Sequence, residues 1–215
     1  MCLGEPGGPA AHGAAERRQP AGLRRRHPGT VGGVRLTRQA HEAVAGVLGE
    51  GGLALDATAG NGHDTRFLAE QVGATGHVWA MDVQPAAIEA TRNQLADAGL
   101  GERVTLLCES HAHIREQVRP HGERQLDAVM FNLGYLPGSD RTRTTGADTT
   151  IPALEQSMAM LASGGCLSLM VYRGHDGGEA EWNAIREWLT GSGYEWRMPV
   201  DPSGHRGPVL VLLTR

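Results

Sequence analysis

Apolar residues along this chain follow two alternating patterns from residue 34 onward. Short, nearly continuous apolar runs predict strands, and they occupy residues 52–58, 76–83, 103–110, 126–133 and 166–172. Between them, apolar residues recur at helical spacing, which predicts helices over 36–50, 64–72, 85–99, 113–118, 148–165 and 177–193. Strands that alternate with helices favour a parallel sheet covered by helices on both faces.

The last two predicted strands, 194–200 and 207–215, differ from the others because only a turn separates them. Strands joined by a turn pair antiparallel, whereas strands joined by a helix pair parallel. The predicted fold is therefore α/β: a doubly wound, Rossmann-like sheet of seven strands in which the last strand is antiparallel.

The first 30 residues have no periodic apolar face and are rich in Gly, Pro, Ala and Arg. Such a composition buries too little apolar surface to offset the entropy of ordering the chain. We expect residues 1–30 to form a disordered tail and residues 31–215 to form one domain. This segment could be a passive tail or the product of an upstream start codon. The third interpretation is an arm whose arginines touch RNA.

Charge does not indicate a nucleic-acid partner. The formal net charge is −4, and the tail holds five arginines but only two glutamates, so the remaining chain is more acidic than the whole. RNA binding would therefore require a local basic patch. No apolar run approaches the roughly 18 residues that a membrane span needs, and we expect no membrane partner.

The three cysteines, Cys2, Cys108 and Cys166, are widely spaced and form no CxxC pair. They predict neither a disulfide framework nor a zinc cluster, and a reducing cytoplasm is the expected compartment. Cys108 and Cys166 lie in predicted strands, so we expect both to be buried. His111 and His113 follow Cys108 without a fourth ligand nearby, and we expect no metal site.

A glycine turn follows the first predicted strand. The stretch LALDATAGNGHDT, residues 53–65, places Gly60, Asn61 and Gly62 between that strand and a helix. Glycines let the backbone approach a ligand closely, and Asp82 at the end of the second strand can accept hydrogen bonds from ribose hydroxyls. This pair of features is compatible with NAD or with S-adenosylmethionine, and a tight turn without any ligand is the remaining alternative.

The order of elements discriminates between these two cofactors. A dinucleotide-binding fold completes its six strands with a second βαβ half, whereas a class I methyltransferase sheet ends in a hairpin with a reversed last strand. The C-terminal strand pair of this chain matches the methyltransferase pattern.

The fourth predicted strand runs into FNLGYLPG, residues 131–138, where amino-directed methyltransferases carry an Asn or Asp, a Pro and an aromatic residue. An amine that is methylated must present its lone pair to the sulfonium methyl group. The carbonyl of Asn132 can orient the amine's hydrogens while Tyr135 packs on the base. A turn capped by Asn132, with Tyr135 covering the core, is the structural alternative.

Five segments carry a resemblance to a known family: DATAGNGHDT, SHAHI, MFNLGYLPGSD, TTGADTTIPALEQSMAMLASGG and VYRGHDGGEAEWNAI. Together they resemble the rRNA methylase family, whose members are associated with methylating 5-aminomethyl-2-thiouridine at the tRNA wobble position. The resemblance runs from about residue 36 to residue 215. It implies a class I methyltransferase fold, S-adenosylmethionine as the donor, and the wobble uridine of the tRNA anticodon loop as the acceptor.

The resemblance also implies cofactor contacts after the first three strands, at Gly60, Asn61, Gly62, Asp64, Asp82, Gln84, Ser110 and His111. Asn61 and Asp64 would lie near the methionine moiety. Asp82 and Gln84 would lie at the ribose and adenine, and the last two residues on the adenine side. The assignments of Gln84, Ser110 and His111 depend mainly on the resemblance, because residues at helix starts can equally satisfy free backbone donors.

Substrate contacts are expected after the fourth and fifth strands. Family members usually carry a lysine after NLGYLPG, where this chain has Arg141 and Arg143. These arginines would form the local basic patch for RNA, and a solvated loop is the alternative. Tyr172 and His175 follow the fifth strand, on the same sheet edge as the glycine turn. Tyr172 would contact the substrate, and His175 would take a proton from its ammonium. The alternative is that His175 caps the next helix or bonds a loop carbonyl.

Three functions are compatible with the sequence. The five segments favour an S-adenosylmethionine-dependent tRNA N-methyltransferase that acts on the wobble uridine. The net charge favours a methyltransferase for a small-molecule amine or another RNA, such as rRNA. A non-enzymatic RNA-binding module is disfavoured, because it has no need for Asp82 and Asn132 at converging strand ends. A homodimer is compatible with the sequence.

Overall fold

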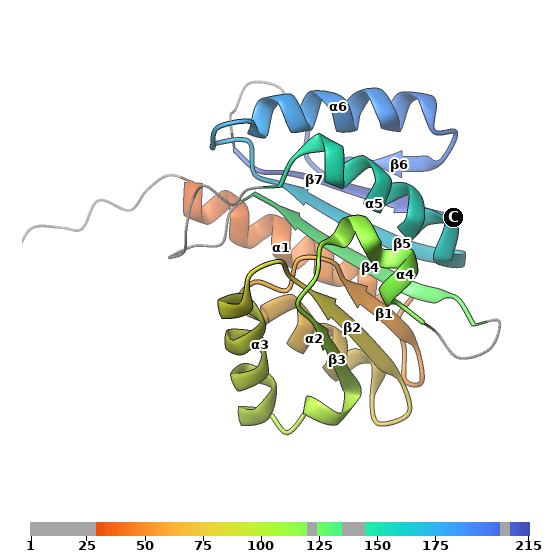
Figure 1. Ribbon diagram of the computed structural model, residues 1–215. Coiled ribbons are helices and arrows are strands. Elements are labelled where there is room, and N and C mark those ends of the chain that lie inside the picture. The colour runs from red at the N-terminus through yellow and green to blue at the C-terminus, as the bar shows by residue number, and fades with distance from the viewer. Residues whose placement is uncertain (1–28, 120–123, 135–144, 203–206) are drawn as a thin grey trace, which may run out of the picture.

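The computed structural model describes residues 29–119, 124–134, 145–202 and 207–215. Within these residues, seven strands form one sheet in the order β3-β2-β1-β4-β5-β7-β6 (Figure 1). The strands are β1 (Leu53–Asp56), β2 (His77–Met81), β3 (Val104–Leu107), β4 (Leu126–Leu133), β5 (Leu161–Val171), β6 (Glu195–Arg197) and β7 (Val209–Thr214).

Pairing is parallel from β3 across to β5 and antiparallel around β7, which pairs with both β5 and β6. The predicted α/β fold, a doubly wound Rossmann-like sheet with an antiparallel last strand, is confirmed. The winding of the sheet reverses between β1 and β4. At such a switch point the carboxyl ends of neighbouring strands leave a crevice in which ligands bind.

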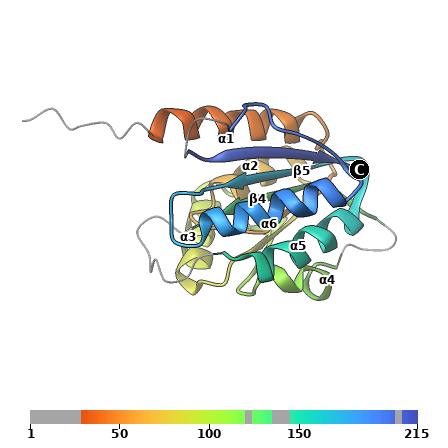
Figure 2. The same ribbon diagram turned by 90° about the horizontal axis from the view of Figure 1, so that it is seen from above.

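Helices cover both faces of the sheet. They are α1 (Gly29–Ala45), α2 (His63–Val72), α3 (Pro85–Asp97), α4 (Ile114–Gln117), α5 (Ala147–Met160) and α6 (Gly178–Gly191), with short 3-10 turns η1 (Gly101–Arg103) and η2 (His111–His113). On one face, Val44 of α1 and Leu68 of α2 are buried in one core cluster. On the other, Leu154 of α5 and Ile185 of α6 are buried in a second cluster. Figure 2 shows α1 and α6 on opposite sides of the sheet.

The alternation of side chains along β4 determines on which face of the sheet Asn132 lies. Phe131 and Leu133 are buried in the cluster beneath α5 and α6, whereas Ala128 and Met130 are buried in the cluster beneath α1 and α2. Successive side chains of a strand point to opposite faces. Asn132 therefore lies on the α1 and α2 face, at the carboxyl end of β4.

Helix α1 differs from its prediction at both ends. A helix over 36–50 is predicted, and the helix runs from Gly29 to Ala45. Three glycines between residues 46 and 51 explain the earlier end, because glycine disfavours helix interiors and Gly51 has a φ of 80°. The apolar stripe of Leu36, Ala40 and Val44 is buried against the sheet.

The boundary between α5 and β5 is also predicted wrongly. The sequence predicts a helix through residue 165, but α5 ends at Met160 and the next eleven residues form β5. Gly165 lies so close to β4 that an added Cβ would be 2.9 Å from the carbonyl O of Asp127. Gly165 therefore permits close strand packing beside a shift in register, and the glycine pair does not terminate the helix.

The two described cysteines differ in exposure. Cys166 is buried within β5, as predicted, whereas Cys108 is exposed. The prediction for Cys108 is wrong because β3 already ends at Leu107, so Cys108 lies beyond the paired part of the strand.

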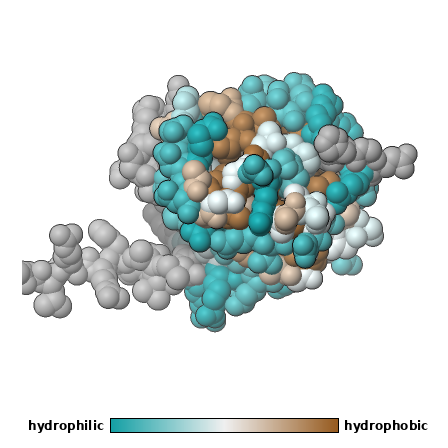
Figure 3. Space-filling model, turned by 90° about the horizontal axis from the view of Figure 1, so that it is seen from below, coloured by the Kyte–Doolittle hydropathy of each residue, from teal (hydrophilic) through white to brown (hydrophobic). Residues whose placement is uncertain are grey.

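Among the described helices, none combines the length and the hydropathy that crossing a membrane requires. On the face seen in Figure 3, hydrophobic residues gather toward the centre and hydrophilic residues surround them.

Candidate active site

A cavity of about 500 Å³ opens where the carboxyl ends of the parallel strands meet. Nine predicted site residues line it: Gly60, Asn61, Asp64, Asp82, Gln84, Ser110, His111, Asn132 and Tyr172. They lie at or just beyond the carboxyl ends of five different strands and are brought together by the parallel order of those strands. Gly62 and His175 are not among the lining residues. Tyr135, Arg141 and Arg143 lie outside the described residues, as does nearly all of the predicted tail.

The glycine turn after β1 is held by the acid that follows β2. The backbone N–H of Gly60 donates to Asp82 Oδ2 at 3.0 Å, and that of Gln84 donates to Asp82 Oδ1 at 2.9 Å. On the other side of the turn, Thr91 Oγ1 donates to the carbonyl O of Gly60 at 3.2 Å. Asp82 is therefore fixed at the edge of the cavity by two backbone donors.

Gly62 shapes the turn without lining the cavity. Its φ is 81°, in the left-handed region, and an added Cβ would lie 2.9 Å from the Cα of Thr91. Only glycine combines this backbone conformation with such close packing of the turn against α3. The predicted contact between Gly62 and a cofactor stays a prediction.

The residues around Asp82 fit a nucleoside. Each oxygen of Asp82 accepts one backbone hydrogen bond, and a carboxylate oxygen has a second lone pair for a ribose hydroxyl. The neighbouring Val83 lines the cavity and is 45% exposed. Its side chain offers apolar surface that an adenine ring can cover. A ribose site beside an apolar rim is what the nucleoside of NAD or S-adenosylmethionine requires.

Ser110 and His111 enter the cavity from the segment after β3. Ser110 Oγ accepts from the backbone N–H of Ala112 at 3.2 Å, so this hydroxyl caps η2. His111 is buried, packs edge-to-face on Phe131 and lies 3.3 Å from Thr149 Oγ1. Burial lowers the pKa of His111, so its imidazole is a neutral wall of the cavity at pH 7.

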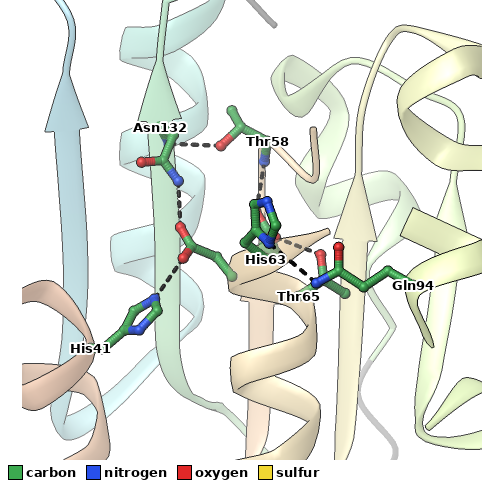
Figure 4. Close-up of polar contacts among 8 residues, drawn as sticks. His41, Thr58, His63, Thr65, Gln94 and Asn132 are labelled. Carbon is green, nitrogen blue, oxygen red and sulfur yellow. Dashed lines mark hydrogen bonds and ion pairs between the residues drawn. The ribbon is translucent and has the colours of Figure 1, made fainter. Parts of the chain in front are cut away.

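Asn132 is held by two contacts, one through its backbone and one through its side chain (Figure 4). Its backbone N–H donates to Thr58 Oγ1 at 2.7 Å, and its side-chain Nδ2 donates to Asp64 Oδ2 at 2.5 Å. One of the two amide N–H donors is thereby used within the protein, and the carbonyl Oδ1 is the amide atom that can accept from a ligand.

Asp64 also contacts His41, a residue that the sequence analysis did not single out. His41 Nε2 lies 2.6 Å from Asp64 Oδ1, and Figure 4 shows His41 reaching from α1 toward the turn between β1 and α2. Thr37, one helical turn before His41, lines the cavity. The sequence signal that could have indicated His41 is this pair of polar residues, Thr37 and His41, one turn apart beside the apolar stripe of α1.

Asp56, the last residue of β1, is a second residue that could not be singled out from the sequence. It is fully buried and accepts from Thr65 Oγ1 at 2.6 Å and from the backbone N–H of Thr58 at 3.1 Å. Burial, and after it the negative charge of Asp64, raise the pKa of Asp56 to about 7. Asp56 ties the start of the turn to α2 without lining the cavity.

Tyr172 closes the cavity from the end of β5. Its backbone N–H donates to the carbonyl O of Leu133 at 2.9 Å, and an added Cβ at Gly134 would lie 3.1 Å from the Cβ of Tyr172. Partial burial and the negative charge of Asp64 raise the pKa of the Tyr172 phenol. The phenol is therefore a neutral group beside the acids.

His175 lies apart from this cavity. Its Nδ1 lies 2.9 Å from the carbonyl O of Asp176, just before α6. This contact agrees with the alternative of a loop hydrogen bond, and a role of His175 as proton acceptor stays a prediction. Within the described residues, no group of three or more His, Cys, Asp or Glu side chains is arranged to hold a metal ion.

The sheet order and the cavity beyond β1 and β2 define the class I methyltransferase fold. Residues 78–194 match the model of the family described as "Putative rRNA methylase". Because this match covers more than half of the chain, the chain belongs to that family.

Two solved structures are similar over nearly their whole length. A "putative rRNA-methylase" from Clostridium thermocellum is 35% identical, with a TM-score of 0.77, and the alignment covers 83% of this chain and 96% of that one. A "putative methyltransferase" from Streptococcus mutans, solved in complex with SAH, is 30% identical with a TM-score of 0.73, covering 84% of this chain and 97% of that one.

A third relative is named for a specific RNA substrate. The chloroplastic tRNA (mnm(5)s(2)U34)-methyltransferase of Arabidopsis thaliana is 37% identical over 166 residues, or 73% of this chain. The match spans 60% of the length of that relative.

Proposed function

We propose that this chain is an S-adenosylmethionine-dependent tRNA methyltransferase that methylates the aminomethyl nitrogen of 5-aminomethyl-2-thiouridine at the wobble position. The observation that carries this proposal is the fixed amide of Asn132, whose nitrogen donates to Asp64 and whose carbonyl is left for an amine donor. The name of the Arabidopsis relative supports the choice of tRNA acceptor.

S-adenosylmethionine is the cofactor, and the cavity beside Asp82 is its site. When bound, it supplies an electrophilic methyl group carried on a sulfonium. Asp82 accepts hydrogen bonds from the ribose hydroxyls with the lone pairs that Gly60 and Gln84 leave unused. The glycine turn admits the rest of the cofactor to close contact with the backbone. The Streptococcus mutans relative, solved with SAH, supports this assignment.

Asn132 acts on the acceptor. Its Oδ1 accepts a hydrogen bond from an N–H of the aminomethyl group, and this contact turns the nitrogen lone pair toward the methyl group. A neutral amine needs no strong base to react, so alignment is the main contribution of the protein. His111, kept neutral by burial, adds no positive charge that would repel the sulfonium or the ammonium form of the acceptor.

The charge of the cavity favours cationic ligands. Asp64 and Asp82 both line it, and the negative charge of Asp64 adds to burial in raising the pKa of Tyr172. An aminomethyl group is an ammonium in water, and a sulfonium is also a cation. Carboxylates in a partly desolvated cavity attract both.

A methyl acceptor in another RNA is the second candidate. The description of the family as an rRNA methylase favours it, and the same amide of Asn132 would orient an exocyclic base amine. It differs from the first candidate in the nucleoside that becomes labelled.

The proposal is tested by incubating the protein with methyl-labelled S-adenosylmethionine and three RNAs, followed by nucleoside analysis. The RNAs are tRNA carrying 5-aminomethyl-2-thiouridine, the same tRNA carrying 2-thiouridine, and unmodified rRNA. We expect label only in the first RNA, in a nucleoside one methyl group heavier than its precursor. Label in the rRNA alone would contradict the tRNA assignment and support the second candidate.

A further inference from the structure

Three side chains from three different elements form a continuous chain of polar contacts that ends at the acceptor side of the cavity. His41 of α1 contacts Asp64 Oδ1 at 2.6 Å, and Asp64 Oδ2 accepts from Asn132 Nδ2 at 2.5 Å. The side chains of His41 and Asp64 are only 26% and 11% exposed. The contacts are therefore largely shielded from competing water.

The carboxylate of Asp64 fixes the direction of both hydrogen bonds, the one with His41 and the one with Asn132. A carboxylate can only accept, so the atom of Asn132 that faces Asp64 must be its amide nitrogen. By the same reasoning, His41 presents a protonated Nε2 to Asp64. The Asn132 carbonyl oxygen is then directed away from Asp64. With an apolar residue in place of His41, Asp64 would lose the donor that holds its rotation.

Two sets of packing contacts fix the position of His41. Its ring stacks on that of Phe67 in α2, with centroids 3.9 Å apart and planes within 3° of parallel. Helix α1 is anchored by the burial of Leu36, Ala40 and Val44. The imidazole therefore reaches Asp64 from a rigid support.

We propose that His41 and Asp64 are positioning residues that set the orientation of the Asn132 amide for the amine acceptor. The inference rests on the proposed function of Asn132. Both residues precede the segment that matches the family model, residues 78–194, so that match does not assign them. Helix α1, which precedes the first strand in the sequence, thereby helps to position the acceptor site.

A matched pair of substitutions separates the hydrogen bond of His41 from its ring stacking. In His41→Phe the ring can still stack on Phe67, but the N–H donor to Asp64 is lost. In His41→Gln the stack is lost, but the side-chain amide can still donate in place of Nε2. Glu42→Gln is the control, because Glu42 is on the same helix and its side chain is 64% exposed.

We expect His41→Phe to lower kcat on tRNA carrying 5-aminomethyl-2-thiouridine by roughly ten- to hundred-fold, because misalignment by about an ångström has such effects. KM for that tRNA should change less than about three-fold, since uniform binding is kept. His41→Gln should restore most of kcat, and Glu42→Gln should leave it unchanged. If His41→Phe kept its activity and His41→Gln lost it, ring stacking and not the hydrogen bond would matter, and the inference would be overturned.

A spectroscopic readout tests the geometry without any substrate. The side-chain amide of Asn132 is assigned in the full-length protein by its absence in Asn132→Ala, and its hydrogen exchange is measured by NMR. We expect protection in the wild type and in His41→Gln, and exchange at least about ten-fold faster in His41→Phe because the Asp64 acceptor is no longer held. Equal protection in all three proteins would contradict a positioning role.

The two proposals fail in different ways. If Asn132→Ala keeps full activity on the tRNA, the proposed acceptor site is wrong, whatever His41 does to the amide. If Asn132→Ala is inactive but His41→Phe keeps wild-type kcat, Asn132 acts without help from His41, and only the further inference is overturned.

Discussion

Gly60 donates its backbone N–H to Oδ2 of Asp82 at 3.0 Å, and this bond joins the turn after β1 to the end of β2. The two parts of the cofactor site are therefore not independent. The acid that would receive the ribose also holds the backbone that would approach the rest of the cofactor. A substitution at Asp82 should affect both the affinity for cofactor and the order of the turn.

Asp82→Ala should weaken binding of S-adenosylhomocysteine by about 1 to 3 kcal/mol, the range for loss of a hydrogen bond to a charged group. Isothermal titration calorimetry measures this directly. Asp97→Ala is the control, because Asp97 is exposed at the end of α3, and it should bind like the wild type. Binding of NAD, with no response to S-adenosylhomocysteine, would contradict the assignment of the cavity.

Gly62→Ala should destabilise the fold more than Gly99→Ala. Both glycines have positive φ, 81° and 67°, and each alanine should cost about 1 to 2 kcal/mol for the left-handed backbone. Only Gly62 adds steric overlap, because its Cβ would lie 2.9 Å from the Cα of Thr91, whereas nothing lies within 4 Å of a Cβ at Gly99. Urea unfolding should give Gly62→Ala a further loss of about 1 to 3 kcal/mol, and equal losses would contradict the close packing.

The raised pKa of Asp56 predicts a pH dependence of stability. The folded protein binds this proton more tightly than the unfolded chain, since the pKa rises from 3.8 to about 7 on folding. The contribution of Asp56 to stability is therefore full below pH 4 and is lost as the pH rises toward 7. Asp56→Asn removes this dependence, because an amide does not titrate.

Urea unfolding of both proteins at several pH values measures this effect. From pH 4 to pH 7, the unfolding free energy of Asp56→Asn should rise relative to that of the wild type. A constant difference over this range would mean that the carboxyl of Asp56 titrates alike in the folded and unfolded chains.

The sheet could be predicted from the sequence because its strands are buried on both faces. Such strands read as short apolar runs whatever their neighbours are, and β1 to β5 were located in this way. The start of β5 was missed because Leu161 continues the apolar spacing of α5 and the glycine pair, Gly164 and Gly165, is typical of a helix end. Only the close approach of Gly165 to Asp127 of β4, a tertiary contact, decides against a helix there.

The site was predictable to the extent that strand ends locate it. Asp82 and Asn132 end or follow predicted strands, and parallel strands bring their carboxyl ends to one edge. His41 could not be found in this way, because it lies on a helix before the first strand. The polar pair of Thr37 and His41 beside the apolar stripe of α1 was a signal for a functional helix face. The contact of His41 with Asp64, however, depends on how α1 packs across the sheet, which that pattern does not encode.

The proposed proton acceptor His175 is tested by the pH dependence of single-turnover methyl transfer. If His175 accepts the ammonium proton, the rate should rise with pH, and His175→Ala should lose this rise. His113→Ala is the control, because His113 is exposed and does not line the cavity. An identical pH profile in His175→Ala would remove His175 from the mechanism and leave alignment by Asn132 as the main contribution.

In the proposed function, Asn132 aligns the aminomethyl nitrogen for methyl transfer. The most direct test of this role is the single-turnover rate of Asn132→Ala on tRNA carrying 5-aminomethyl-2-thiouridine, measured beside calorimetric binding of S-adenosylhomocysteine. We predict a rate at least about a hundred-fold below wild type with cofactor affinity nearly unchanged, because the lost contact acts on the acceptor alone. A wild-type rate in Asn132→Ala on this tRNA would contradict the account.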